Sequence, residues 1–120
     1  MVLVDTSVWV EHLRRRDARL TALLESAEVL THPFVIGELA CGNLARRQEV
    51  LGALRALPGA PVAQDTEVLD FIGAHRLQGR GLGFIDIHLL ASARLAGFPL
   101  WSADKHLAAV AEELGRGIRR

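Results

Sequence analysis

The segment Val2-Leu3-Val4-Asp5-Thr6-Ser7, residues 2–7, decides how the rest of the chain is interpreted. Its first three residues are apolar, which is typical of a short strand buried on both faces of a sheet. Asp5 ends this run, and apolar side chains then recur at helical spacing over residues 8–15. A buried strand that passes through an acid into a helix is typical of a parallel α/β sheet.

The same alternation of strands and helices continues along the chain. Further strands are predicted at residues 29–31 and 98–101, with weaker candidates at 61–63 and 117–119. Helices are predicted after an N-cap at Asp17, and at residues 33–41, 46–57, 66–77, 84–95 and 102–114, with Asp65 and Ser102 capping two of them. This order predicts a single domain, residues 1–120, folded as a three-layer α/β/α sandwich with a central parallel sheet of four to five strands.

Composition excludes several classes of protein. Among the 120 residues, half are hydrophobic, and 14 basic residues balance 14 acidic ones. High apolar content with zero net charge excludes intrinsic disorder and argues against a general DNA coat, but not against a nucleic-acid enzyme with segregated charges. A single cysteine, Cys41, excludes a disulfide scaffold and favours the reducing cytoplasm. Neither a signal peptide nor a membrane span is predicted, because apolar runs are too short.

Four carboxylates stand where this topology predicts one edge of the sheet. Asp5 and Asp104 follow predicted strands, Asp86 opens a nearly apolar helix, and Glu38 lies among apolar neighbours in another helix. For each acid alone, helix capping, the helix dipole or a solvated helix face is a simpler interpretation. Together they would repel, by roughly 4 kcal/mol for two carboxylates ~4 Å apart, so a cluster needs either a cation or the uptake of protons.

The kind of cation follows from the available donors. Carboxylate oxygens without paired thiols or imidazoles favour a hard ion, Mg²⁺ or Mn²⁺, over zinc. Such an ion suits phosphoryl chemistry, where it activates water and neutralises phosphate charge.

These segments together resemble PIN-domain ribonucleases, and the chain length is similar to that of VapC-like toxins of type II toxin–antitoxin pairs. Each motif alone is weak, but their order and spacing from Val2 to about Leu107 are specific. The matching stretches are residues 2–9, residues 35–39 around Glu38, residues 83–93 around Asp86, and residues 100–104 ending at Asp104.

The resemblance implies a metal-dependent endoribonuclease that cleaves RNA and acts as a toxin. Asp5, Glu38, Asp86 and Asp104 would form the acidic, metal-holding pocket, with Asp5 and Asp86 foremost as direct ligands. Thr6 and Ser102 would be hydroxyl partners that orient carboxylates or water, with helix capping as an equal alternative. The resemblance also implies a cytoplasmic homodimer and a small antitoxin whose tail fills the active-site groove.

Two residues near the third acid have open roles. Arg80, among the glycines before Asp86, is a candidate for binding the RNA backbone. His88 lies two residues past Asp86, either as an RNA contact or proton donor, or as a packed histidine with one satisfied hydrogen bond, which we favour.

Two other classes of function remain open at this point. A receiver-type phosphoacceptor module also uses an acidic pocket and a lysine in an α/β sheet. It expects two adjacent acids after the first strand, where this chain has Asp5 followed by Thr6 and Ser7. A catalytically idle PIN-like binding domain is the third reading, and the presence of all four acids counts against it.

Overall fold

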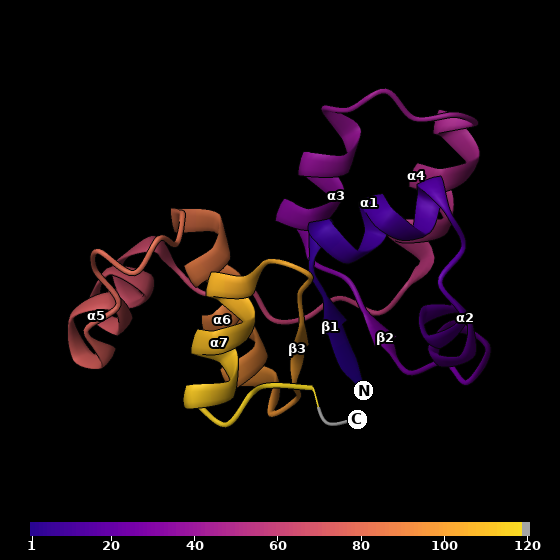
Figure 1. Ribbon diagram of the computed structural model, residues 1–120. Coiled ribbons are helices and arrows are strands. Elements are labelled where there is room, and N and C mark those ends of the chain that lie inside the picture. The colour runs from indigo at the N-terminus through magenta and orange to yellow at the C-terminus, as the bar shows by residue number, and fades with distance from the viewer. Residues whose placement is uncertain (119–120) are drawn as a thin grey trace.

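Three short parallel strands form the centre of the protein. The computed structural model describes residues 1–118. β1 (Val2–Val4) lies between β2 (Val29–Leu30) and β3 (Leu100–Trp101), which gives the order β2-β1-β3. Leu3 is opposite Leu30 on one side and opposite Leu100 on the other. The carboxyl ends of all three strands therefore meet at one edge of the sheet, as the alternation predicts (Figure 1).

The prediction of four to five strands is wrong, because the described sheet has three. In place of further strands, the structure has two isolated parallel bridges. Thr31 pairs with Gly59, and Leu100 pairs with Gly117. The segment 61–63 forms no strand, and its first residue is Pro61, which has no N–H to donate to a neighbouring strand. Of the candidate strand 117–119, residue 119 lies outside the described residues.

Seven helices in the described residues connect and flank the strands. Most lie within two residues of their predicted bounds, and Asp17 caps the second helix by accepting the N–H of Leu20 at 2.9 Å. Two predicted caps are displaced: Gln64 is the N-cap where Asp65 was expected, and Asp104 is the N-cap where Ser102 was expected. The bounds are α1 Thr6–Arg14, α2 Ala18–Glu25, α3 Pro33–Ala40, α4 Arg47–Ala56, α5 Asp65–His75, α6 Phe84–Ala96 and α7 Lys105–Glu113.

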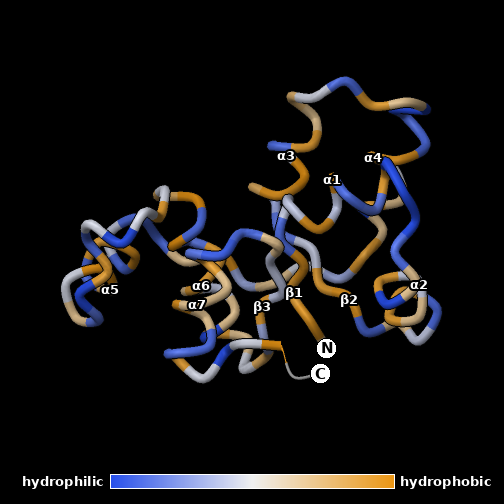
Figure 2. The backbone as a smooth tube through the Cα atoms, viewed as in Figure 1, coloured by the Kyte–Doolittle hydropathy of each residue, from blue (hydrophilic) through white to orange (hydrophobic). Residues whose placement is uncertain are grey.

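The helices fall into two groups on the two sides of the sheet. Helix α3 packs against α1 and α4, whereas α6 packs against α5 and β3, and α7 also packs against β3. Figure 1 shows these groups separated across the carboxyl end of β1. Figure 2 shows hydrophobic residues running through the strands between the groups, and Leu3, Val4 and Leu100 are almost fully buried. The site acids come from both groups.

Candidate functional site

Asp5 is the buried centre of the site. It follows β1 directly and is only 5% exposed. Two hydroxyls donate to the same carboxylate oxygen, Oδ2: Ser7 at 2.7 Å and Ser102 at 2.8 Å. Within residues 1–118, no hydrogen bond reaches the other oxygen, Oδ1. The two serines thus fix the carboxylate and leave one of its oxygens available to a cation.

Ser7 is a site residue that sequence reasoning missed. The N-cap of α1 is Asp5, whose side chain makes no capping bond. Ser7 Oγ instead accepts the N–H of Ala103 at 2.9 Å, and Ser102 Oγ accepts the N–H of Asp104 at 3.0 Å. The segment after β3 is thereby tied to Asp5 through two hydroxyls. The only available signal was a second hydroxyl directly behind an acid at a strand end.

Thr6 connects the first helix of the chain to the helix that carries the second acid. Its Oγ1 donates to Glu38 Oε1 at 2.6 Å, between the start of α1 and the last turn of α3. Glu38 itself is exposed. The expected role of Thr6 in orienting a carboxylate therefore has a matching contact, although Thr6 also opens α1.

Asp86 lies at the start of α6 and interacts electrostatically with the other three acids. Its Oδ2 accepts the N–H of Gly83 at 2.9 Å. Partial burial raises the pKa of the Asp86 carboxyl above its ordinary value; the Gly83 N–H opposes this shift, and the charges of Asp5, Asp104 and Glu38 add to it. Three acids from separate segments of the chain are therefore near enough to Asp86 for their charges to act on it.

Asp104 combines a capping role with a place at the rim of the site. Its Oδ1 accepts the N–H of Leu107 at 3.0 Å, which is the N-cap interaction anticipated as the simpler alternative. The residue is exposed, and His106 Nδ1 lies 3.9 Å from the same oxygen. The charge of Asp104 still contributes to the raised pKa of Asp86, so Asp104 can cap α7 and interact with another acid at the same time.

The donor set fits a hard divalent cation held by few direct ligands. Within residues 1–118, no three His, Cys, Asp or Glu side chains converge closely enough to hold one metal ion. Magnesium commonly takes only one or two carboxylates and keeps several waters, so such convergence is not required. A buried carboxylate with one free oxygen, beside a second acid whose charge is disfavoured, suits that mode of binding.

His88 and Arg80 both have protein partners. His88 is 1% exposed, and its Nε2 lies 3.0 Å from Asp65 Oδ1, which agrees with the packed histidine that we favoured. Arg80 Nη2 lies 3.0 Å from both carboxylate oxygens of Glu113 on α7. This pair is exposed, and exposed pairs contribute little free energy, so it can exchange with another anion.

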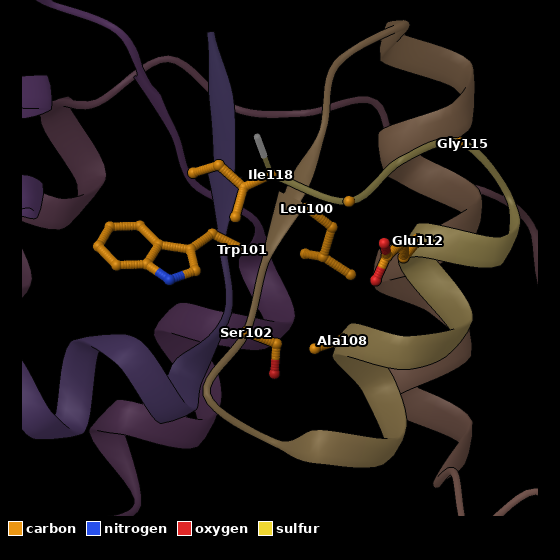
Figure 3. A pocket seen from close by; sticks show the side chains of 8 residues that line it. Leu100, Trp101, Ser102, Ala108, Glu112, Gly115 and Ile118 are labelled. Atoms are coloured by element: carbon orange, nitrogen blue, oxygen red, sulfur yellow. The ribbon is translucent and has the colours of Figure 1, made fainter. Parts of the chain in front are cut away.

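A cavity of about 700 Å³ beside β3 is separate from the acids. Figure 3 shows Ser102 and Ala108 at one end of it and Gly115 and Ile118 at the other. Its only carboxylate is Glu112, and the Ser102 hydroxyl is already bound to Asp5. None of the four predicted acids therefore lines this cavity.

Comparison with known proteins agrees with this arrangement. The PIN domain family matches residues 2–113. The chain belongs to the PIN domain family. Ribonuclease VapC32 from two Mycobacterium tuberculosis strains, CDC 1551 / Oshkosh and H37Rv, is 51% identical over 116 residues, covering 96% of this chain and 94% of the relative.

A solved structure shares the PIN fold. The crystal structure of Mycobacterium tuberculosis VapC20, described as a Sarcin-Ricin loop cleaving toxin, aligns with a TM-score of 0.65 at 23% identity. The alignment covers 92% of this chain and 95% of that one. Neither the receiver-type module nor the idle binding domain gains support from these relatives. Within the described residues, no helix of this PIN domain has the length and apolar character needed to cross a membrane.

Proposed function

We propose that this PIN domain is a divalent-metal-dependent endoribonuclease and the toxin of a toxin–antitoxin pair. The observation that carries the proposal is Asp5, buried at the carboxyl end of β1 and held through one oxygen by Ser7 and Ser102, with Asp86 near enough to feel its charge. The 51% identity to a ribonuclease supports RNA as the substrate. When bound, Mg²⁺ or Mn²⁺ would neutralise the charge of the phosphate and activate water.

The residues divide the work according to their burial. Asp5, buried and held by two serine hydroxyls, and Asp86, whose charge is disfavoured without a partner, hold the cation. Glu38 and Asp104 are exposed at the rim, where they orient water and accept a proton. Thr6 and Ser102 keep Glu38 and Asp5 in place, and Arg80 contacts a phosphate that flanks the cleaved bond.

A groove beside Glu38 is the surface that we assign to the antitoxin. It has a volume of about 360 Å³, and its walls come from α1, α3 and the segment after α3. Val10 and Leu13 line it and are each more than 40% exposed, so an apolar segment bound in the groove would bury both side chains. We also propose a cytoplasmic homodimer, which light scattering on the purified protein would test.

Metal dependence is tested by cleavage of a mixed ribosomal and transfer RNA substrate. We expect cleavage with Mg²⁺ or Mn²⁺, loss of cleavage with a chelator, and recovery when Mg²⁺ is restored. Cleavage that persists in excess chelator would contradict the metal-dependent mechanism. Intact RNA under every metal condition would contradict the nuclease assignment.

A further inference from the structure

His32 is a fully buried histidine at the junction of β2 and α3. It is 0% exposed and is the N-cap of α3. Its Nδ1 accepts the N–H of Phe34 at 3.0 Å, so this nitrogen carries no proton. The hydrogen therefore resides on Nε2, which lies 3.1 Å from Ser92 Oγ and donates to it.

The ring can make both bonds only in its neutral form. Burial and, to a smaller extent, the neighbouring imidazole of His88 on α6 together lower the pKa of His32 to about 4. At neutral pH the ring thus has one acceptor nitrogen, Nδ1, and one donor nitrogen, Nε2, and each has a hydrogen-bond partner. Ser92 is also 0% exposed, so breaking its hydrogen bond with His32 would leave a buried polar group without a hydrogen-bond partner.

This imidazole joins the two groups of helices that carry the acids. Glu38 is on α3, which packs against α1 and α4, whereas Asp86 is on α6, which packs against α5 and β3. The two helices stand apart in Figure 1, on either side of the strand ends. The bond from His32 to Ser92 crosses between them, and an edge contact of Phe34 with His88, with centroids 4.8 Å apart, lies alongside.

We propose that His32 is a positioning residue that sets the separation of the Glu38 and Asp86 helices through Ser92, and thereby the affinity of the site for a divalent cation. This inference rests on the proposed function, because it takes Glu38 and Asp86 as site acids. A cation site tolerates little displacement of its supporting groups. The bond between these two fully buried groups joins the start of α3 to the third turn of α6.

A purely local role as a helix cap is the competing explanation, and two variants separate it from positioning. Ser92→Ala leaves the bond from His32 to the Phe34 N–H intact but removes the link to α6. His32→Asn offers a side chain that also caps helices but is too short to reach Ser92. Thr31→Val is the matched control, because it removes a buried hydroxyl, 4% exposed, that has no partner in the described residues.

The first measurement is Mn²⁺ titration by calorimetry without RNA, on variants whose thermal melts show a folded protein. We expect Ser92→Ala and His32→Asn to weaken Mn²⁺ binding by about tenfold, the lower end of the effect of losing a residue that orients ligands. Thr31→Val should bind Mn²⁺ like the wild type. Equal affinity in all four proteins would overturn the proposal, even if both variants are less stable.

The second measurement follows the helix separation directly in the metal-free protein. Cys41, the only cysteine, is exposed at the end of α3, and Leu95→Cys places a second label on an exposed position of α6. Pulsed electron spin resonance should show a broader or shifted distance distribution in Ser92→Ala and His32→Asn, but not in Thr31→Val. An unchanged distribution in both variants would overturn the proposal.

The variant Asp86→Asn distinguishes an error in the role of His32 from an error in the proposed metal site. If Asp86→Asn abolishes Mn²⁺ binding while Ser92→Ala and His32→Asn behave like the control, only the positioning role is wrong. If Asp86→Asn binds Mn²⁺ and cleaves RNA like the wild type, the proposed site is wrong.

Discussion

Ser102 Oγ donates a hydrogen bond to Asp5 Oδ2 at 2.8 Å across 97 residues of chain. This bond ties the end of β3 to the end of β1, and Ser7 donates to the same oxygen. The network gives Asp5 one occupied and one free carboxylate oxygen.

Removing either serine hydroxyl should weaken cation binding more than folding. We expect Ser7→Ala and Ser102→Ala each to lower Mn²⁺ affinity by about tenfold, because outer partners of a metal ligand have effects of that size or larger. Calorimetric titration measures this, with Ser26→Ala as the control, since Ser26 is an exposed residue at the end of α2. Wild-type affinity in both variants would show that the network only caps and packs.

Releasing Arg80 from its carboxylate partner should strengthen RNA binding. Glu113→Gln removes the charge that holds the Arg80 guanidinium, so a phosphate can take its place. We expect Arg80→Gln to weaken binding and to reduce the slope of log K against log salt by about 0.7, the value for one contact to a single strand. Filter binding in excess chelator over a salt series measures both. An unchanged slope in Arg80→Gln would show that Arg80 does not contact the backbone.

The groove beside Glu38 should be needed for neutralisation but not for cleavage. Leu13→Gln replaces an exposed apolar side chain, 41% accessible, that lines the groove. If an apolar antitoxin segment binds there, its affinity should fall by about tenfold, or ~1.4 kcal/mol. Inhibition of RNA cleavage by the purified antitoxin measures the effect, with Leu69→Gln on α5 as the control. Equal inhibition of both variants would place the antitoxin elsewhere.

Stability should fall as pH decreases from about 6.5 to 4 because of His32. Its folded-state pKa, about 4, lies below the unfolded value of 6.5, so the unfolded chain binds more protons in this window. At about 1.4 kcal/mol per pKa unit, the full loss is about 3 kcal/mol. Urea unfolding at pH 7.5 and 4.5 should show a smaller pH effect in His32→Asn. The same pH effect in both proteins would contradict a neutral, buried His32.

Much of the fold could be predicted from local patterns in the sequence. Val2 to Val4 formed the predicted strand, and Asp5 is at its carboxyl end, because a short apolar run before an acid has few other uses in an α/β chain. The segment 61–63 was predicted as a weaker strand, yet Ala63 is buried outside the sheet. Whether an apolar run pairs with a strand depends on residues far away in the chain, and local residue spacing gives no information about them.

The four acids of the proposed site could be selected from the sequence, but the hydrogen bonds that connect them to other segments could not. Asp5 and Asp104 were selected because they follow predicted strands, and Glu38 and Asp86 because a carboxylate among apolar neighbours needs a partner. Ser7 was missed because its role depends on Ala103, 96 residues away, and the bond from His32 to Ser92 spans 60 residues. Such pairings follow from the order of the strands rather than from periodicity.

The most direct test of the account is the rate of RNA cleavage by Asp86→Asn at saturating Mg²⁺, beside Asp70→Asn, an exposed acid on α5 outside the site. Both substitutions keep the side-chain shape and remove one charge. The account predicts that Asp86→Asn lowers the cleavage rate by at least about a hundredfold with the fold intact, in line with the loss of a group that stabilises transition-state charge. Asp70→Asn should cleave like the wild type. Cleavage by Asp86→Asn at the rate of Asp70→Asn would contradict it.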